Sequence, residues 1–153
     1  MEIRLATLND IGQLCHLFTE FFAYNAALQP EFCNASIESG EYPKMVIEDD
    51  NADILVAVDN GAIIGYVHIR ESKTLPYAPI VQHKYAEIID FMVSDSSRRK
   101  GAGLLLMDAA KEWGVKRNLD YIELFVLSNA KEANAFYHNY GFEVKSHTMR
   151  YTL

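Results

Sequence analysis

The stretch VSDSSRRKGAGLLL, residues 93–106, decides how the rest of the chain is interpreted. Three consecutive cations (98–100) stand directly before the triplet Gly-Ala-Gly (101–103), and an apolar pattern of helical spacing begins at once. The N-terminus of a helix offers unpaired backbone N–H groups and a positive potential, and glycines let a ligand approach that backbone closely. We therefore expect this turn to bind an anion, and a phosphate or pyrophosphate is the usual occupant of such a site.

Two common phosphate-binding motifs do not fit this stretch. The pattern GxxxxGK[ST] is absent, and a dinucleotide-type GxGxxG that began at Gly101 would need glycine where Leu106 stands. What remains is the pattern Arg98-x-x-Gly101-x-Gly103, preceded by a predicted strand. The alternative is a solvated basic turn that binds no ligand.

The segments around the turn alternate between strand and helix patterns. The first part of the chain predicts a strand in MEIRLAT, a helix from Ile11 to before Pro30 and a shorter helix within 34–48. A hairpin around Asn60-Gly61, a strand at 85–93 and a helix after the basic turn are expected next. The last part predicts a strand at 121–127, a helix that begins with Asn129 as its cap and ends at Gly141, and two short strands between Phe142 and Leu153. The predicted fold class is a single α/β domain over residues 1–153. Its sheet is mixed and mostly antiparallel, flanked by helices in the order β-α-α-β-β-β-α-β-α-β-β.

Composition excludes several classes of function. The net charge of the 153 residues is -7, which argues against a nucleic-acid-binding surface. No apolar run approaches the roughly 20 residues of a membrane span, and Glu2 stands where a signal peptide carries cations. The two cysteines lack CxxC spacing and the five histidines lack metal-ligand spacing. We expect a cytoplasmic protein without a metal site.

The pattern RRKGAG resembles the signature [Q/R]-x-x-G-x-[G/A] of the GNAT superfamily of acetyl-CoA-dependent N-acetyltransferases. The stretch AEIIDFMVSDSSRRKGAGLLLMDAA is similar to the central strand, turn and helix of that family. The stretch SNAKEANAFYHNYGFE resembles its second hallmark, a helix that ends in F-Y-x-x-x-G-F. The order of elements matches as well, so the resemblance covers essentially the whole chain.

The resemblance implies a site for acetyl-CoA. The implied cofactor-binding residues are Phe91, Met92 and Val93 for the pantetheine arm, Arg98, Arg99, Lys100, Gly101, Ala102, Gly103 and Leu104 for the pyrophosphate, and Asn129 and Asn134 as further polar contacts. Many relatives place an asparagine seven residues before the tyrosine of the second hallmark, where this chain has Ala130. Whether Asn129 contacts the cofactor therefore stays open.

The resemblance also implies catalytic residues. Tyr137, the tyrosine of the second hallmark, is predicted to donate a proton to the departing thiolate, since a phenol is protonated at neutral pH. Glu87 is the first candidate for the base that takes a proton from the amine, and Asp90 and ordered water are the alternatives. Strand alternation predicts that Glu87 and Asp90 lie on opposite faces of the sheet.

The acceptor is predicted only as a class. Tyr24, Phe32 and Tyr42 are expected to shape its site, together with the loop at 72–84, and the acidic charge favours a cationic primary amine. The predicted activity is transfer of an acetyl group from acetyl-CoA to that amine, in a small molecule or in a peptide or protein. A noncatalytic acyl-CoA-binding regulatory module and a phosphate-binding structural domain are the alternatives. Assembly as a homodimer stays open.

Overall fold

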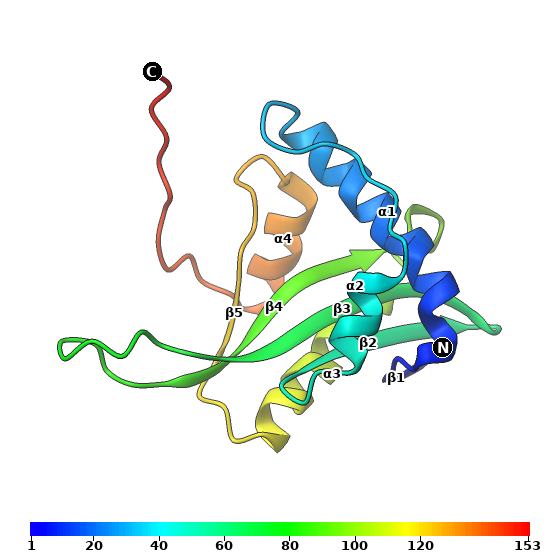
Figure 1. The fold of residues 1–153 in the computed structure, drawn as a ribbon, viewed down its shortest axis with the longest axis horizontal. Helices are drawn as coiled ribbons and strands as arrows, with labels where there is room; N and C mark the ends of the chain where they lie inside the picture. Colours follow the sequence, from blue (N-terminus) through cyan, green and yellow to red (C-terminus); the bar gives the residue numbers. More distant parts are fainter.

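The computed structural model describes residues 1–153 and arranges them around one five-stranded sheet (Figure 1). The elements are β1 (Glu2–Leu5), η1 (Leu8–Asp10), α1 (Ile11–Leu28), α2 (Glu41–Ile47), β2 (Ala52–Asp59), β3 (Ala62–Lys73), β4 (Lys84–Val93), η2 (Asp95–Ser97), α3 (Ala102–Lys116), β5 (Ile122–Leu124) and α4 (Lys131–Tyr140). The strand order is β1-β2-β3-β4-β5, antiparallel from β1 to β4 and parallel between β4 and β5. The predicted mixed, mostly antiparallel sheet flanked by helices is confirmed.

The hairpin of β2 and β3 forms where the sequence predicted it. Asn60 and Gly61 both have positive φ, 50° and 80°, as a tight two-residue turn requires. The ladder closes at the pair Asp59 and Ala62. The turn therefore sets the register of β2 against β3 at this end of the hairpin.

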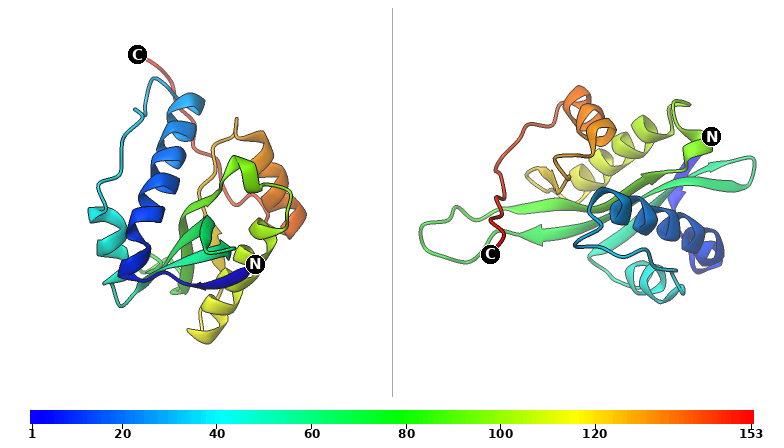
Figure 2. Two further views of the ribbon diagram at one scale, coloured as in Figure 1. Left: turned by 90° about the vertical axis from the view of Figure 1, so that its right-hand side faces the viewer. Right: turned by 90° about the horizontal axis from the view of Figure 1, so that it is seen from above.

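Helices cover both faces of the sheet (Figure 2). On one face α1 and α2 pack on a cluster that includes Phe18, Val56 and Tyr66. On the other face α3 packs on a second cluster that includes Val67 and Leu106, with α4 at its margin. Side chains alternate between the faces along each strand, so β3 supplies both clusters. None of the helices combines the length and the apolar character that a membrane crossing needs.

A partly buried ion pair ties β1 to the start of α1. Both terminal nitrogens of Arg4 lie 2.8 Å from the carboxylate oxygens of Asp10, and the N–H of Thr7 donates to the same carboxylate at 2.7 Å. A capping box between Thr7 and Asp10 is present at the start of η1. The hydrogen bonds from Arg4 hold the pKa of Asp10 well below its usual value.

The last part of the chain differs from the prediction. Residues 142–153 form no strand, and β5 covers Ile122–Leu124 instead of 121–127. β5 pairs with β4 over three residues, and no strand lies on its other edge. An isolated extended segment has no ladder to join, so the alternating sequence pattern is not sufficient to form strands there.

Candidate active site

The turn between β4 and α3 exposes a run of free backbone donors. Arg99 and Gly101 both adopt the left-handed region, with φ of 63° and 87°, and α3 begins directly after them. None of the N–H groups from Arg99 to Leu104 has a hydrogen-bond partner within the chain. The first turn of a helix has no internal acceptors for these groups, and together with the helix dipole they favour an anion. The sequence predicted an anion site at this turn, and its geometry fits one.

Arg98 spans the opening between α1 and α4. Its guanidinium lies 2.8 Å from Asp95 and 3.4 Å from Glu132 on α4, and its Cζ lies 5.9 Å from the ring centre of Tyr24 on α1. The two cations that follow it in sequence are exposed and have no acidic partner. The charge of Arg98 is therefore paired within the protein, whereas Arg99 and Lys100 are available to bind an anion.

β4 and β5 part before β4 ends. Their parallel ladder covers only Ala86–Ile88 of β4. Further on, Phe91 and Val93 still pair with β3, opposite Val67 and Gly65, but no strand lies on their other side. On that side the carbonyl of Val93 accepts from Arg98 Nε at 3.4 Å. The other outward backbone groups of residues 91–93 are open, and an extended ligand could pair with them as an added strand.

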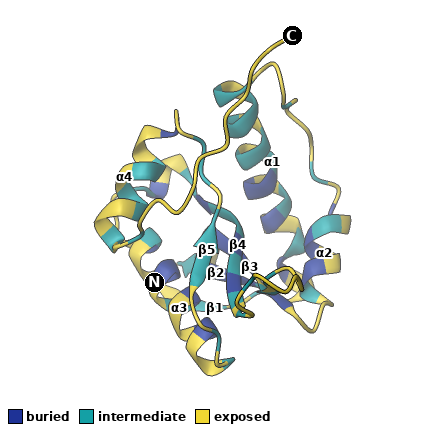
Figure 3. Ribbon diagram, turned by 90° about the vertical axis from the view of Figure 1, so that its left-hand side faces the viewer, coloured by how far each residue is buried: buried dark blue, intermediate teal, exposed yellow.

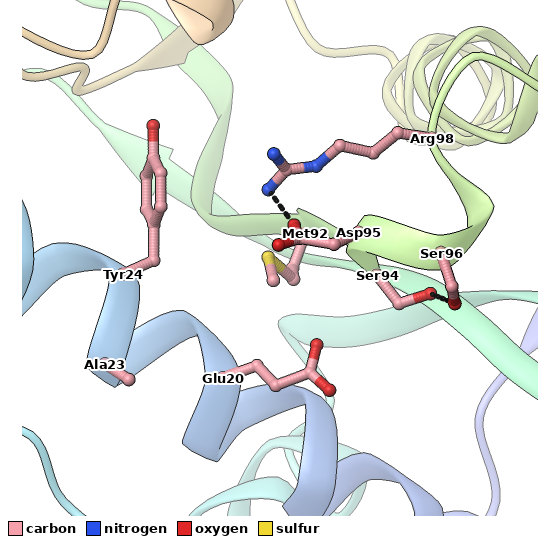
Figure 4. Close-up of a pocket in the computed structure, with 8 residues that line it drawn as sticks. All are labelled: Glu20, Ala23, Tyr24, Met92, Ser94, Asp95, Ser96 and Arg98. Carbon is pink, nitrogen blue, oxygen red and sulfur yellow. Dashed lines mark hydrogen bonds and ion pairs between the residues drawn. The ribbon is translucent and has the colours of Figure 1, made fainter.

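A hollow of about 490 Å³ opens between α1 and the end of β4 (Figure 4). It is lined by Glu20, Ala23, Tyr24, Met92, Ser94, Asp95, Ser96 and Arg98. Its volume falls within the range usual for small-molecule sites, roughly 300–1,000 Å³. In Figure 4 the guanidinium of Arg98 reaches across the hollow toward Tyr24, and Glu20 adds a second carboxylate beside that of Asp95. The hollow adjoins the basic turn, so one ligand could occupy both.

Tyr137 lies on α4, close enough to Tyr24 of the hollow for the two phenols to interact electrostatically. Its ring packs against Phe91 and Phe142, with ring centres 6.1 and 5.7 Å apart. Burial raises the pKa of the Tyr137 phenol, and the nearby Tyr24 raises it further. The hydroxyl makes no hydrogen bond within the chain, although it is not fully enclosed. Tyr137 is therefore a protonated donor without a partner.

The two asparagines predicted to contact the cofactor donate hydrogen bonds to the protein backbone. The amide of Asn129 donates to the carbonyl of Leu28 at the end of α1, at 2.7 Å. Asn129 does not cap α4, as the sequence predicted, because the helix begins after Ala130. The amide of Asn134 donates to Leu127 at 2.7 Å and to Ala130 at 2.8 Å, which fixes the connection between β5 and α4.

A bulge in β4 corrects one prediction about the candidate bases. The register with β3 shifts between Ile88 and Asp90, so Ile89 is the extra residue. Glu87 lies opposite Arg70, and Asp90 lies opposite His68. Since a bulge inserts one residue into the alternation, Glu87 and Asp90 lie on the same face and not on opposite faces. That face is the one covered by α1 and α2, because Met92 belongs to its cluster.

Glu87 is engaged in an ion pair. Its Oε2 accepts from Arg70 Nε at 2.8 Å and lies 2.7 Å from the second nitrogen of the same guanidinium. The hydroxyl of Ser72 donates to the same oxygen at 2.8 Å. If Glu87 were the base, the proton from the amine would have to compete with these three donors for the carboxylate.

Asp90 belongs to a buried polar cluster with Tyr42 and His68. The hydroxyl of Tyr42 lies 2.8 Å from His68 Nδ1 and 3.4 Å from Asp90 Oδ2, and the ring nitrogen lies 3.6 Å from the same carboxylate. Burial and the Asp90 charge raise the pKa of Tyr42. The sequence analysis did not single out His68. The available signal was a lone imidazole within the apolar run AIIGYVHIR of β3.

The residues predicted to shape the acceptor site do not gather in one place. Tyr24 lines the hollow, and Tyr42 lies in the polar cluster on the same side of the sheet. Phe32 is 54% exposed and stacks under Arg150, whose Cζ lies 3.6 Å from its ring centre. The loop at 74–83 lies at the opposite end of β4 from the hollow (Figure 1). The structure therefore groups only Tyr24 and Tyr42 with the other candidate residues.

Comparison with known proteins agrees with this geometry. Residues 12–142 match the family described as Acetyltransferase (GNAT) family. YhfO of Bacillus subtilis, an uncharacterised N-acetyltransferase, is 24% identical over 156 residues, which span 100% of this chain and 97% of that relative. An uncharacterised N-acetyltransferase of Archaeoglobus fulgidus is 26% identical over 137 residues, which span 90% of this chain and 89% of that relative.

Solved structures share the fold. A tetramutant of the BH1408 protein from Bacillus halodurans superimposes with a TM-score of 0.94 at 26% identity, over 100% of both chains. An aminoglycoside acetyltransferase from an uncultured soil metagenomic sample has a TM-score of 0.74 at 21% identity, over 99% of this chain and 95% of its own.

Proposed function

Because the chain belongs to the GNAT family of acetyltransferases, we propose that it transfers the acetyl group of acetyl-CoA to a primary amine of a small molecule or a peptide. Membership of the family makes the chain an acyltransferase. The donor, the class of acceptor and the roles of individual residues are the content of the proposal.

The free N–H groups from Arg99 to Leu104 carry the proposal. They form a row of free donors at the start of α3, and two unpaired cations lie beside them. A pyrophosphate group needs this combination of backbone donors and positive charge. Coenzyme A has such a group next to an extended pantetheine arm, and residues 91–93 of β4 offer the open backbone edge for that arm. Acetyl-CoA supplies an activated thioester, and the chain binds and orients it.

We assign Tyr137 the role of donor to the leaving sulfur. Its phenol has no partner in the chain, and its raised pKa keeps it protonated at neutral pH. A raised pKa also makes complete proton transfer less favourable, so the first contribution is a hydrogen bond that strengthens as charge develops on sulfur. Open N–H groups of residues 91–93 would polarise the thioester carbonyl.

Two carboxylates on the α1/α2 face could receive the proton of the amine. Glu87 is the candidate predicted from the sequence, but it is held by Arg70 and Ser72. Asp90 lies three positions nearer the end of β4 and next to Tyr42 and His68, which could pass a proton on. We propose Asp90 as the proton acceptor and Glu87 as a residue that positions Arg70. Asp90→Asn should then lower kcat more than Glu87→Gln does.

The acceptor we propose is a cationic amine. Glu20 and Asp95 line the hollow beside the proposed position of the thioester, and the net charge of the chain is -7. Both features attract a protonated amine by long-range steering. The two free cysteines fit a reducing compartment, and we place the activity in the cytoplasm as part of the same proposal.

A thiol-release assay with acetyl-CoA tests the proposal. The acceptor panel would hold polyamines, aminoglycosides, amino acids and short lysine-containing peptides, with calorimetry of acetyl-CoA binding on the same sample. We expect amine-dependent release of thiol and acetylated product by mass spectrometry. Binding without turnover over the whole panel would favour the noncatalytic acyl-CoA-binding module instead. Absence of binding would refute the donor assignment.

A further inference from the structure

A polar cluster of Tyr42, His68 and Asp90 lies between α2 and the sheet, in the region that Figure 3 colours as buried or intermediate. The side chains of His68 and Asp90 are only 6% and 12% exposed. Three elements meet here, since Tyr42 comes from α2, His68 from β3 and Asp90 from β4. The hydrogen bonds of so small a cluster can be assigned one by one, and they decide which atoms are open to a substrate proton.

The hydroxyl of Tyr42 has one proton and two acceptors within reach. Its oxygen lies 2.8 Å from Nδ1 of His68 and 3.4 Å from Oδ2 of Asp90. A hydroxyl that donates to a charged carboxylate approaches it to about 2.5–2.7 Å. The contact with Asp90 is longer than that, so the proton of Tyr42 belongs to the bond with His68.

The imidazole of His68 is consistent with that direction. A neutral imidazole has one protonated nitrogen, which donates, and one bare nitrogen, which accepts. Nε2 has no hydrogen-bond partner in the chain and is not a fully enclosed atom, so it reaches solvent. A proton on Nε2 can be donated to water there, which leaves Nδ1 bare to accept from Tyr42.

Asp90 is left without a strong donor. Its nearest ones are the Tyr42 hydroxyl at 3.4 Å and Nδ1 of His68 at 3.6 Å, and no other donor of the chain binds its carboxylate. The oxygen Oε2 of Glu87, by contrast, receives three donor atoms at 2.7–2.8 Å. Hydrogen bonds that a carboxylate accepts stabilise its charged form and occupy its lone pairs. The lone pairs of Asp90 therefore stay open for a proton from the amine.

We propose that His68 is a positioning residue for acetyl transfer: its Nδ1 accepts the hydroxyl of Tyr42 and so keeps that donor away from Asp90. The inference rests on the proposed function, in which Asp90 takes the proton of the amine. In that step an N–H bond of the ammonium breaks and an O–H bond forms on Asp90. The electron pair stays on the nitrogen, which can then attack the thioester carbonyl. His68 acts only through Tyr42.

Other ionisable groups face this cluster from the sheet and from the loop before α2. Besides burial and the charge of Asp90, the charges of Arg70 and Glu38 act on the pKa of Tyr42, in opposite directions. The phenol of Tyr66 is buried on the same side of the sheet, and α1 faces the cluster with apolar and aromatic side chains. None of these groups donates a hydrogen bond to Asp90, and all of them are the same in the variants below.

The pH profile of kcat in the thiol-release assay tests this role. Its acidic limb reports the groups that must be deprotonated in the complex with substrate. His68→Leu removes the acceptor, so the hydroxyl of Tyr42 turns to Asp90 and stabilises its charged form. We expect the limb to move to lower pH by about one unit and kcat at the plateau to fall about threefold. His68→Asn keeps an acceptor oxygen at the place of Nδ1 and should hold the limb at its wild-type pH.

Two further variants separate this role from a structural one. Tyr42→Phe, added to His68→Leu, removes the donor and should return the limb to its wild-type pH. His83→Leu is the matched control, because Nδ1 of His83 lies 2.7 Å from Asp120 at the other end of β4, and it should leave the limb unchanged. A structural role would lower the stability of the His68 variants without moving the limb. An unmoved limb in His68→Leu, or an equal shift in His68→Asn, would overturn the inference.

The tautomer of His68 gives a measurement that needs no turnover. Long-range proton–nitrogen NMR spectra of the isotopically labelled wild type at about pH 8 distinguish the two ring nitrogens. We expect a proton on Nε2 and a bare Nδ1, and a proton on Nδ1 would overturn the inference even in an active enzyme. Absence of turnover with every amine would refute the proposed function on which the inference rests. The spectra distinguish that failure from a wrong assignment of the hydrogen bonds.

Discussion

The turns at Asn60-Gly61 and at Arg99–Gly101 both contain left-handed residues but have different surroundings. Both place two residues in the left-handed region, with φ of 50° and 80° in the first turn and 63° and 87° in the second. The first turn closes a ladder whose polar groups are paired within the sheet. The second turn leaves every N–H group from Arg99 to Leu104 without a partner. Paired polar groups hold the fold together, and the unpaired N–H groups of the second turn are the ones that we propose bind the cofactor.

An aspartate at each turn should distinguish the turn that only shapes the fold from the turn proposed to bind the cofactor. The difference in acetyl-CoA affinity between the two variants is the largest effect we expect. A Cβ would meet nothing within 4 Å at either Gly61 or Gly101, so each variant should lose only about 1 kcal/mol of stability through left-handed strain. Gly101→Asp also sets a negative charge beside the proposed position of the pyrophosphate, at a cost of about 4 kcal/mol or roughly 1,000-fold in affinity. Calorimetry of acetyl-CoA binding should show this loss for Gly101→Asp and no loss for Gly61→Asp. Equal affinities would end the assignment of the turn.

Two tyrosines of α4 extend the comparison to side chains. The hydroxyl of Tyr140 donates to Asp108 at 2.7 Å, whereas that of Tyr137 has no partner. Tyr137→Phe should lower kcat about 100-fold, as expected for loss of a positioned proton donor, with little change in acetyl-CoA affinity or in stability. Tyr140→Phe removes an equivalent hydroxyl from the same helix and should leave kcat unchanged. A Tyr137→Phe enzyme with normal kcat would remove Tyr137 from the chemistry.

The sequence predicts best where a local signal is sufficient. Asn60-Gly61 specifies its turn, and the donors of the basic turn follow from a helix start at Ala102. The bulge at Ile89 has no such signal, because any residue of an apolar strand can be the extra one. Only the register with β3 reveals that Glu87 and Asp90 share a face. The prediction that Asn129 caps α4 was wrong for a similar reason, since the partner of its side chain, Leu28, lies 101 residues away in the sequence.

The ion pair of Arg4 with Asp10 tests whether polar groups that are paired within the chain stabilise the fold. Asp10→Asn leaves Arg4 without its charge partner, and we expect a loss of about 2 kcal/mol in unfolding free energy at pH 7, below the usual range because Arg4 is partly exposed. The folded state lowers the pKa of Asp10, so this stability is fully present above the unfolded value near pH 4 and is lost as the pH falls through the folded value. Urea titrations from pH 7 to pH 3 should show the wild type and the variant converging. A difference that does not depend on pH would mean that the carboxylate charge does not matter.

The hydroxyl of Tyr66 should give the smallest effect and the opposite sign. It is buried in the α1/α2 cluster and is the one buried side-chain polar atom without a hydrogen-bond partner. Burial raises the pKa of this phenol far above its usual value, so the hydroxyl stays neutral and simply lacks an acceptor. Removing an unsatisfied group avoids its desolvation cost, so Tyr66→Phe should raise the unfolding free energy by up to about 1 kcal/mol.

Tyr42→Phe is the matched control, because its hydroxyl lies 2.8 Å from His68. Loss of that hydrogen bond should lower the unfolding free energy by about 1 kcal/mol. If both variants lose stability equally in urea titrations, the Tyr66 hydroxyl has a partner in solution. The change from tyrosine to phenylalanine would then not distinguish a paired from an unpaired hydroxyl at these two positions. The contrast between paired and unpaired polar groups would rest on the two turns and on Tyr137 and Tyr140 alone.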